Sequence, residues 1–276
     1  SVRKLNKKYI KSIVKKALEE DLKPYGDITT NLIKNKNKSV RALIISKQDG
    51  IISGLDFCKS AFLQTGKEAK FLKKFSDGSI VKKNNILAEV KAKTKTILKA
   101  ERTALNFLNH ASGISTLTNK FVSKVKNKSK ICCTRKTAPN LRILEKYAVK
   151  KGGGYNHRYN LSDEVLIKEN HIKCENLITL IKKAKRTRKV ITVEIEKISQ
   201  LKKILGLKFK RVLFDNMSIN ELKKCLKICK DKYETEFSGN VNIKNVKKIS
   251  NTGVLRISVG AITHSAKYFN TSLLFR

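Results

Sequence analysis

Tryptophan is absent from this chain of 276 residues, and only 22 acidic residues stand against 62 lysines and arginines. A run of about 18 or more apolar residues is also absent, so we expect neither a membrane-spanning helix nor a membrane partner. Hydrophobic residues still make up 40% of the chain, which is enough for a buried core and too many for a disordered protein. The length indicates one large domain or two modest ones.

The N-terminal residues do not have the pattern of a secretion signal, because no continuous apolar stretch follows their basic start. Apolar side chains recur instead at helical spacing, at Leu5, Tyr9, Ile13 and Ala17, and predict an amphipathic helix. The expected location of the protein is therefore the cytoplasm.

Two groups of binding motifs are missing. Neither Gly-x-Gly-x-x-Gly nor Gly-x-x-x-x-Gly-Lys-Ser/Thr follows a candidate strand, which argues against a conventional dinucleotide or P-loop site. The cysteines include no Cys-x-x-Cys pair and no further ligands at zinc-site spacing. We expect all six to be buried or half-buried thiols in a reducing compartment: Cys58, Cys132, Cys133, Cys174, Cys225 and Cys229.

The formal charge of +40 comes from 51 lysines and 11 arginines that are spread over nearly every segment. A dedicated nucleic-acid surface concentrates its basic residues in one stripe, often with stacking aromatic side chains. Dispersed lysine indicates instead a bias in residue usage on the solvent-facing sides of the helices, and charge is an argument about solubility rather than fold. We therefore expect no specific nucleic-acid partner. A basic nucleic-acid-binding protein is the alternative from a different functional class.

The first part of the chain, residues 1–113, mixes helices with short strands. The stretches VRALIIS, GIISG and ILAEVKA are candidate strands, and glycine turns at Asp49-Gly50 and Asp77-Gly78 favour tight reversals. The segment from about Thr96 to His110 carries leucines at helical spacing. This part is predicted to be an α+β unit with one sheet.

From about residue 114 the pattern changes to repeated units of a strand followed by a helix. Such alternation predicts parallel strands joined by helices. Six such units favour a closed or nearly closed α/β barrel, with an open doubly wound sheet as the alternative. The candidate strands are KICC near 131, EVLI near 165, VITVEI near 192, RVLF near 212, YETEF near 235 and LRISV near 256.

Polar residues follow these strands, and the carboxyl ends of barrel strands share one mouth where active sites are built. A basic set suits carboxylates and phosphates: Thr134, Arg135, Lys136, Arg158 and Lys168. The small turns Ser238-Gly239-Asn240 and Ser258-Val259-Gly260 can hold a terminal phosphate through backbone N–H groups. The glycine run before His157 lets the backbone approach a ligand closely.

Two acidic side chains complete this set. Glu194 and Asp215 are hard oxygen ligands that can hold Mg²⁺ against a pyrophosphate. Glu196 lies on the same face of its strand as Glu194, so a share in the metal site stays open for it. A polyanion, a metal ion and a phosphate together describe a phosphoribosyl donor.

Six stretches of the chain resemble one known family. The block TRKTAPNLRILEKYAVKKGGGYNHRYNLSDEVLIKENHI is the most specific, and EDLKPYGDITTNLI, ERTALNFLNHASGISTLT, VEIE, FDNMS and SVGAITHSAK occur around it in order. The chain thereby resembles the quinolinate phosphoribosyltransferase family, also called nicotinate-nucleotide pyrophosphorylase (carboxylating), from about Glu19 to its C-terminus.

The resemblance implies a fold and a reaction. The fold is an α/β sandwich domain at residues 1–113, joined by residues 270–276, and an incomplete α/β barrel of the TIM type at residues 114–269. The reaction converts quinolinate and phosphoribosyl pyrophosphate, with Mg²⁺, into nicotinate mononucleotide, pyrophosphate and CO₂, a step of de novo NAD synthesis.

The resemblance also implies roles for single residues. The two quinolinate carboxylates are expected at Arg135, His157, Arg158 and Lys168, and the donor also at Lys136 and Lys168. Glu194 and Asp215 match the metal and ribose positions, so the catalytic set is Lys136, Lys168, Glu194 and Asp215. The 5′-phosphate is expected at residues 238–240 and 258–260. Arg102 matches an arginine that reaches the neighbouring subunit's site, which implies an obligate homodimer or a larger oligomer.

Two positions depart from the usual pattern of this family. Cys133 stands where aspartate is common, which removes a carboxylate near Arg135 and Lys136, and Asn140 stands where glycine is common. A paralogue of the same fold with another donor or acceptor, such as the molybdenum-utilisation relatives, is the alternative within the family.

Overall fold

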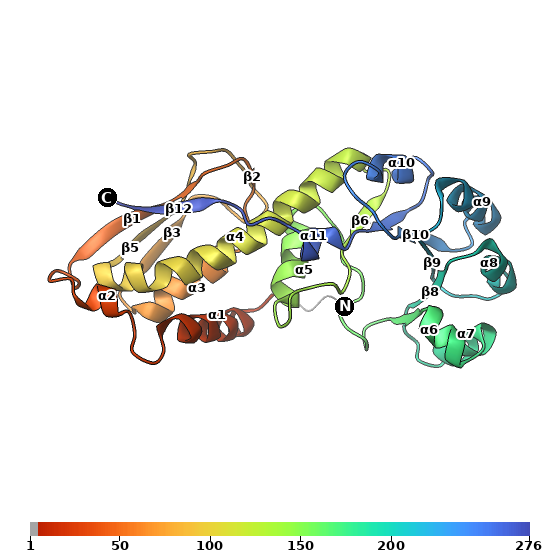
Figure 1. Cartoon of the computed structure of the whole chain (residues 1–276), viewed down its shortest axis with the longest axis horizontal. Helices are drawn as coiled ribbons and strands as arrows, with labels where there is room; N and C mark the ends of the chain where they lie inside the picture. Colours follow the sequence, from red (N-terminus) through yellow and green to blue (C-terminus); the bar gives the residue numbers. More distant parts are fainter. Residues whose placement is uncertain (1–4) are drawn as a thin grey trace. The chain divides into compact units, whose positions relative to one another are not determined.

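The computed structural model describes residues 5–276 (Figure 1). Residues 1–4, which begin the predicted first domain, lie outside the described residues. Two compact units are present. The N-terminal unit comprises residues 5–117, 143–153 and 266–276, and the C-terminal unit comprises Thr118–Arg142 and Gly154–Ser265.

An antiparallel sheet forms the centre of the N-terminal unit, with strand order β12-β1-β5-β3. Its strands are β1 (Ser39–Ser46), β3 (Lys70–Lys73), β5 (Ile86–Lys93) and β12 (Thr271–Phe275). The last strand of the chain thus lies beside the first, blue next to orange-red in Figure 1. A separate two-stranded sheet pairs β2 (Gly50–Ile51) with β4 (Ile80–Val81).

Helices accompany this sheet: α1 (Lys7–Leu22), α2 (Ile28–Asn31), α3 (Leu55–Thr65), α4 (Thr94–Val125) and α5 (Arg142–Lys151). The amphipathic helix predicted at the N-terminus is confirmed as α1, and the Asn6 side chain caps it by accepting from the N–H of Tyr9. Its fully buried stripe is Ile10, Val14 and Leu18, one residue further along than the predicted stripe, which is half-buried.

Two glycines, one at a predicted turn and one at the predicted end of the first domain, allow close packing of neighbouring segments instead. Helix α4 continues well past the predicted end near His110, through Gly113. A Cβ at Gly113 would lie 2.1 Å from the carbonyl oxygen of Lys267, so glycine is needed there for the approach of another segment. Gly50 likewise begins a strand rather than a turn, and a Cβ there would lie 2.6 Å from both Phe269 and Thr116.

The C-terminal unit contains a parallel sheet of six strands in the order β6-β11-β10-β9-β8-β7. All six predicted strands are confirmed: β6 (Lys130–Cys132), β7 (Val165–Ile167), β8 (Ile191–Ile195), β9 (Arg211–Asp215), β10 (Glu234–Ser238) and β11 (Arg256–Ser258). The helices between them are α6 (Glu169–Cys174), α7 (Leu177–Lys185), α8 (Ile198–Ile204), α9 (Ile219–Cys229), α10 (Val246–Ser250) and α11 (Ala261–His264).

The strand order distinguishes the two predicted topologies. It runs in one direction from β7 to β11, and β6 follows β11, whereas a doubly wound sheet reverses its order at a switch point. Among the described residues, no ladder joins β6 to β7; away from its ladder with β11, β6 makes a single bridge, from Cys132 to Tyr155. The predicted incomplete α/β barrel is therefore confirmed.

Alternation along each strand separates an apolar outer face from a polar inner one. In β9, Val212 and Phe214 are completely buried, whereas Leu213 and Asp215 line a cavity on the other face. Helix α9 begins with a capping box between Ser218 and Glu221 and buries Leu222 and both of its cysteines. The apolar core thus leaves the inner face of the barrel for charged side chains.

The expectation of buried or half-buried free thiols is met with one exception. None of the six cysteines forms a disulfide, and five of them are buried, but Cys174 at the end of the short helix α6 is exposed. Within residues 5–276, no helix is long and apolar enough to cross a membrane.

Candidate active site

A cavity of about 910 Å³ opens at the carboxyl ends of the parallel strands in the C-terminal unit. Each of the six strands contributes residues from its end or from the loop that follows it. The structure brings together here Thr134, Arg135, Lys136, His157, Arg158, Lys168, Glu194, Asp215, Ser238, Gly239, Asn240, Ser258 and Gly260. These segments lie far apart in the sequence and meet only because the strands are parallel.

Three residues from the sequence-based set lie elsewhere. Arg102 is exposed on helix α4, in the N-terminal unit. Val259 is buried and its N–H donates to the carbonyl oxygen of Cys132, so that N–H is occupied. Glu196 is exposed just beyond the end of β8 and lies outside the described residues that line the cavity, in contrast to Glu194.

The basic side of the cavity contains two guanidinium groups that repel each other. Burial lowers the pKa of Arg158, and the positive charge of Arg135 lowers it further. The Nε atom of Arg135 is buried without a hydrogen-bond partner among the described residues. Two like charges and a buried donor that lacks an acceptor are favourable only when an anion lies between them.

The acidic side of the cavity consists of Glu194 and Asp215. Burial raises the pKa of Glu194; the Lys168 ammonium, 3.4 Å away, lowers it, and the Asp215 charge raises it again. Asp215 accepts hydrogen bonds from the Ser238 hydroxyl and from the Asn216 side-chain amide. The two carboxylates therefore lie close enough to repel each other, which a cation between them would relieve.

The loops that follow β9 and β10 form one wall of the cavity, and this wall depends on left-handed backbone conformations. Gly239 has φ of +103°, and Asn216 and Asn240 also lie in the left-handed region at +52° and +50°. The N–H of Asn216 donates to the carbonyl oxygen of Ser238, which joins the two loops. A Cβ on Gly239 would lie 2.1 Å from Oδ1 of Asn216, so this wall requires glycine there.

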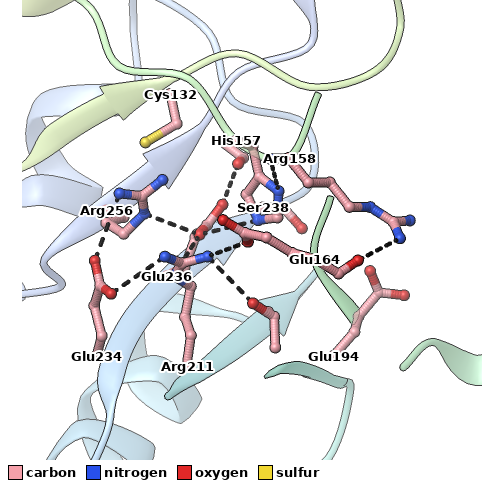
Figure 2. A network of polar contacts seen from close by, with 12 residues as sticks. Cys132, His157, Arg158, Glu164, Glu194, Arg211, Glu234, Glu236, Ser238 and Arg256 are labelled. Carbon is pink, nitrogen blue, oxygen red and sulfur yellow. Dashed lines mark hydrogen bonds and ion pairs between the residues drawn. The ribbon is translucent and has the colours of Figure 1, made fainter. Parts of the chain in front are cut away.

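Beneath the cavity, the fully buried carboxylate of Glu236 lies between Arg211, Arg256 and His157 (Figure 2). Its Oε2 atom is 3.2 Å from Nε of Arg256, 3.5 Å from Nε of Arg211 and 3.4 Å from Nε2 of His157. Its Oε1 atom accepts a short hydrogen bond from the Ser258 hydroxyl. This one carboxylate thus contacts side chains from the end of β11 and from the loop that contains His157.

Further charges surround these two arginines. Glu234, on the same face of β10 as Glu236, approaches Arg211 at 3.2 Å and Arg256 at 3.5 Å, and Glu164 approaches Arg211 at 3.3 Å. Buried ions persist when they are paired and hydrogen-bonded, and removal of one partner leaves an uncompensated charge. The inner face of the barrel therefore contains a charged cluster in place of an apolar filling.

This arrangement makes the acid stability of the protein depend on Glu236. Burial alone would raise the pKa of Glu236, but the His157 side chain, the Arg256 guanidinium and the Ser258 hydroxyl lower it to about 2 from an ordinary value of 4.5. A depressed pKa stabilises the fold above the ordinary value, and that contribution is lost as the pH falls from about 4.5 to about 2. We expect a loss on the order of 3 kcal/mol in the free energy of unfolding.

Urea unfolding of the wild type and of Glu236→Gln, between about pH 6 and pH 2.5, measures this contribution. The difference in unfolding free energy between the two proteins should shrink as the pH falls below about 4.5, because unfolded wild type then binds a proton at Glu236 that the folded protein does not, whereas the amide binds none. A difference that stays constant over this range would show that Glu236 is not the group responsible.

Comparison with known proteins decides the family of the chain. Residues 114–274 match the family "Quinolinate phosphoribosyl transferase, C-terminal domain", and residues 27–112 match the corresponding N-terminal domain. A relative from Methanocaldococcus jannaschii named "Probable nicotinate-nucleotide pyrophosphorylase (carboxylating)" is 39% identical over 97% of both chains. The chain belongs to the quinolinate phosphoribosyl transferase family.

Solved structures of the quinolinate phosphoribosyl transferase family have the same fold. The nicotinate-nucleotide pyrophosphorylase from Francisella tularensis is 36% identical, with a TM-score of 0.95, and the match covers 100% of this chain and 99% of that one. The protein of that name from Ehrlichia chaffeensis is 39% identical, with a TM-score of 0.93, over 99% and 100% of the two chains.

The two departures from the usual family pattern have different structural consequences. Asn140 has φ of +65°, the left-handed region that glycine adopts freely and that asparagine tolerates better than other residues. Cys133 is buried, and its thiol donates to Oδ1 of Asn156 at 3.2 Å. Asn140 thus fits a left-handed backbone, and Cys133 places a thiol against Asn156 at the position where the sequence pattern predicts a carboxylate.

Three residues at or beneath this cavity were missed at the level of sequence. Asn216 and His264 also line the cavity, and Glu236 lies beneath it. The signal for Glu236 was available, because Glu234, Glu236 and Ser238 alternate along one strand and must share a face. A carboxylate two residues before a predicted phosphate loop was therefore bound to point into the barrel.

Proposed function

We propose that the chain is a quinolinate phosphoribosyltransferase. It transfers the phosphoribosyl group of phosphoribosyl pyrophosphate to the ring nitrogen of quinolinate and releases pyrophosphate and CO₂, which yields nicotinate mononucleotide for NAD synthesis. The single observation that supports this most strongly is the pair Arg135 and Arg158 in one cavity, with a buried Arg135 donor that has no partner among the described residues. A dicarboxylate is the substrate that supplies acceptors to both guanidinium groups.

Quinolinate then binds at the basic side of the cavity. Arg135 and Arg158 hold its carboxylates as planar donors, and Lys168 supplies a third positive charge. His157 lies beside Arg158, and the N–H of Arg158 donates to its Nδ1 at 2.8 Å. These contacts direct the ring nitrogen toward the carboxylate side, where the ribose of the donor lies.

Mg²⁺ fits the carboxylate side. Among the described residues no group of three or more His, Cys, Asp or Glu side chains could hold a metal ion, so the protein itself offers Glu194 and Asp215 only. Mg²⁺ is commonly held by one or two carboxylates together with substrate phosphates and water, and the mutual repulsion of these two acids supports a cation there. When bound, the ion neutralises charge on the departing pyrophosphate.

The donor lies across the remaining walls. Lys136 and Lys168 contact the pyrophosphate, and the turns at Ser238-Gly239-Asn240 and Ser258-Gly260 hold the 5′-phosphate. The hydroxyls of Ser238 and Ser258 donate to Asp215 and Glu236. Backbone N–H groups of these turns are therefore the donors that we assign to the phosphate.

Catalysis follows from charge and position. As the bond between ribose C1 and pyrophosphate breaks, the ribose carbon becomes cation-like, and Glu194 and Asp215 favour that state over the ground state. Lys136 and Lys168 neutralise the leaving group. The ring nitrogen is held in line behind the carbon, so positioning supplies much of the rate. The positive charge on the nitrogen of the resulting pyridinium then stabilises the electron pair that stays on the adjacent ring carbon when its carboxylate leaves as CO₂. That carbon takes up a proton from water to give the product.

The proposal includes an oligomer. Arg102 is exposed on α4, where it can reach a second subunit, and we assign it to the neighbouring site of a homodimer or larger assembly. The cytoplasmic location stays a prediction.

Turnover with controls tests the function. Purified protein incubated with quinolinate, phosphoribosyl pyrophosphate and Mg²⁺ should form nicotinate mononucleotide, measured by chromatography. Nicotinate in place of quinolinate should give none, because it lacks the second carboxylate that the paired arginines require. Chelation of Mg²⁺ should abolish product, and added Mg²⁺ should restore it. Absence of product from folded, oligomeric protein would overturn the proposed function.

A further inference from the structure

Glu236 has no direct place in the proposed reaction, yet it contacts two walls of the site. Its Oε2 atom faces Nε2 of His157 at 3.4 Å, and its Oε1 atom accepts from the hydroxyl of Ser258. His157 and Ser258 both line the cavity, whereas Glu236 is completely buried and lies outside the lining residues. One carboxylate thus connects the acid-binding side to the phosphate-binding side.

The orientation of His157 follows from its two ring nitrogens. Nδ1 accepts the backbone N–H of Arg158 at 2.8 Å, so the ring proton of the neutral imidazole is on Nε2. That N–H faces the carboxylate of Glu236, whose Oε2 atom lies 3.4 Å from Nε2. The carboxylate therefore selects the tautomer and the ring orientation in which His157 holds the main chain of Arg158.

Glu236 can serve this purpose because it is a completely buried carboxylate with a guanidinium group on each side. Arg211 and Arg256 approach its Oε2 at 3.5 and 3.2 Å, and β10 lies between β9 and β11 in the sheet. A side chain that is held on both flanks by guanidinium groups transmits its position to the residues that it contacts.

We propose that Glu236 is a positioning residue that sets the geometry of both subsites, through His157 and Arg158 on one side and through Ser258 on the other. The inference rests on the proposed function, because it concerns how that site recognises its substrates. Glu236 touches neither substrate itself. Its loss should therefore weaken binding of quinolinate while the positive charges that contact the substrate remain in place.

A purely structural ion cluster is the competing explanation, and the chain contains a matched control for it. Glu234 lies on the same strand and face and pairs with the same two arginines, at 3.2 and 3.5 Å. Its ion pairs join it to these two arginines, and it lies outside the residues that line the cavity. Glu234→Gln thus removes a carboxylate from the cluster and leaves the contacts of Glu236 with His157 and Ser258 intact.

The experiment compares Glu236→Gln with Glu234→Gln in the full-length protein. For each variant, thermal unfolding, the dissociation constant of quinolinate by calorimetry, and KM and kcat for both substrates are measured. Both variants should lose thermal stability. Only Glu236→Gln should raise the quinolinate dissociation constant and KM, by about 10- to 100-fold, the usual effect of removing a side chain that orients a ligand-binding one.

The possible outcomes separate this inference from the proposed function. Equal quinolinate affinity in Glu236→Gln and Glu234→Gln, with an active wild type, would overturn the positioning role and leave the function intact. An inactive wild type would instead overturn the function. Should Glu236→Gln not fold, Glu236→Asp keeps the charge but withdraws the carboxylate by one methylene group. It should then show weakened quinolinate binding with near-normal stability, and unchanged binding would refute the role.

Discussion

Replacement of Arg135 by alanine should lower kcat/KM for quinolinate by about 100- to 1000-fold, equivalent to about 3–4 kcal/mol. Arg135 lines the cavity, and its buried Nε has no partner among the described residues, so the substrate is expected to supply the missing acceptor. Its removal also relieves the repulsion on Arg158. The fold should therefore tolerate the change while substrate binding does not. Steady-state kinetics with each substrate varied in turn measures the effect.

Two further variants define what Arg135 contributes. Arg135→Lys keeps the charge but loses the planar fork, and should fall between the wild type and Arg135→Ala. Arg186→Ala removes an exposed arginine after helix α7 and should leave the kinetics unchanged. If Arg135→Ala impairs only the phosphoribosyl pyrophosphate KM, or behaves like Arg186→Ala, the assignment of Arg135 to the acid-binding side is incorrect.

Most of the cavity lining could be predicted from the sequence, because parallel strands gather their carboxyl ends at one edge. The strands are short and apolar, and the polar residues that follow them are the ones found in the cavity, from Arg135 after β6 to Gly260 after β11. The local pattern is sufficient to predict these lining residues, because the barrel brings the carboxyl ends of its strands together. The sequence predicted Glu194 as a metal ligand and left Glu196 open, and of these two only Glu194 lines the cavity.

What the sequence could not supply are contacts between distant segments. Nothing local shows that Glu236 meets His157 or that Arg211 meets Glu164, since each pair is far apart in the chain. The continuation of helix α4 past its predicted end near His110, through Gly113, was missed for the same reason. Gly113 is needed because the backbone of Lys267 approaches helix α4 closely there. Whether a glycine ends a helix or permits such a contact within it depends on its neighbours in space, which the local sequence does not show.

The loop glycine of the predicted phosphate turn leads to the second large expected effect. Gly239→Ala should destabilise the protein by about 2–4 kcal/mol, the sum of left-handed strain and overpacking. Its φ is +103°, and the added Cβ would lie 2.1 Å from Oδ1 and 2.8 Å from the backbone nitrogen of Asn216. Because backbone atoms are involved, rotation of one side chain cannot relieve the clash. The loops after β9 and β10 must separate.

Gly253→Ala is the matched control for this variant. Gly253 has a similar φ of +92°, but a Cβ there would meet no described atom within 4 Å. Gly253→Ala should therefore lose only the free energy of the left-handed strain, about 1–2 kcal/mol of unfolding free energy, and keep normal turnover. Gly239→Ala should in addition lose roughly 100-fold in kcat/KM for phosphoribosyl pyrophosphate, since displacement of the wall by about 1 Å misplaces the phosphate. Denaturant unfolding and kinetics on both variants test this, and equal losses of stability with unchanged kinetics would remove residues 238–240 from the phosphate site.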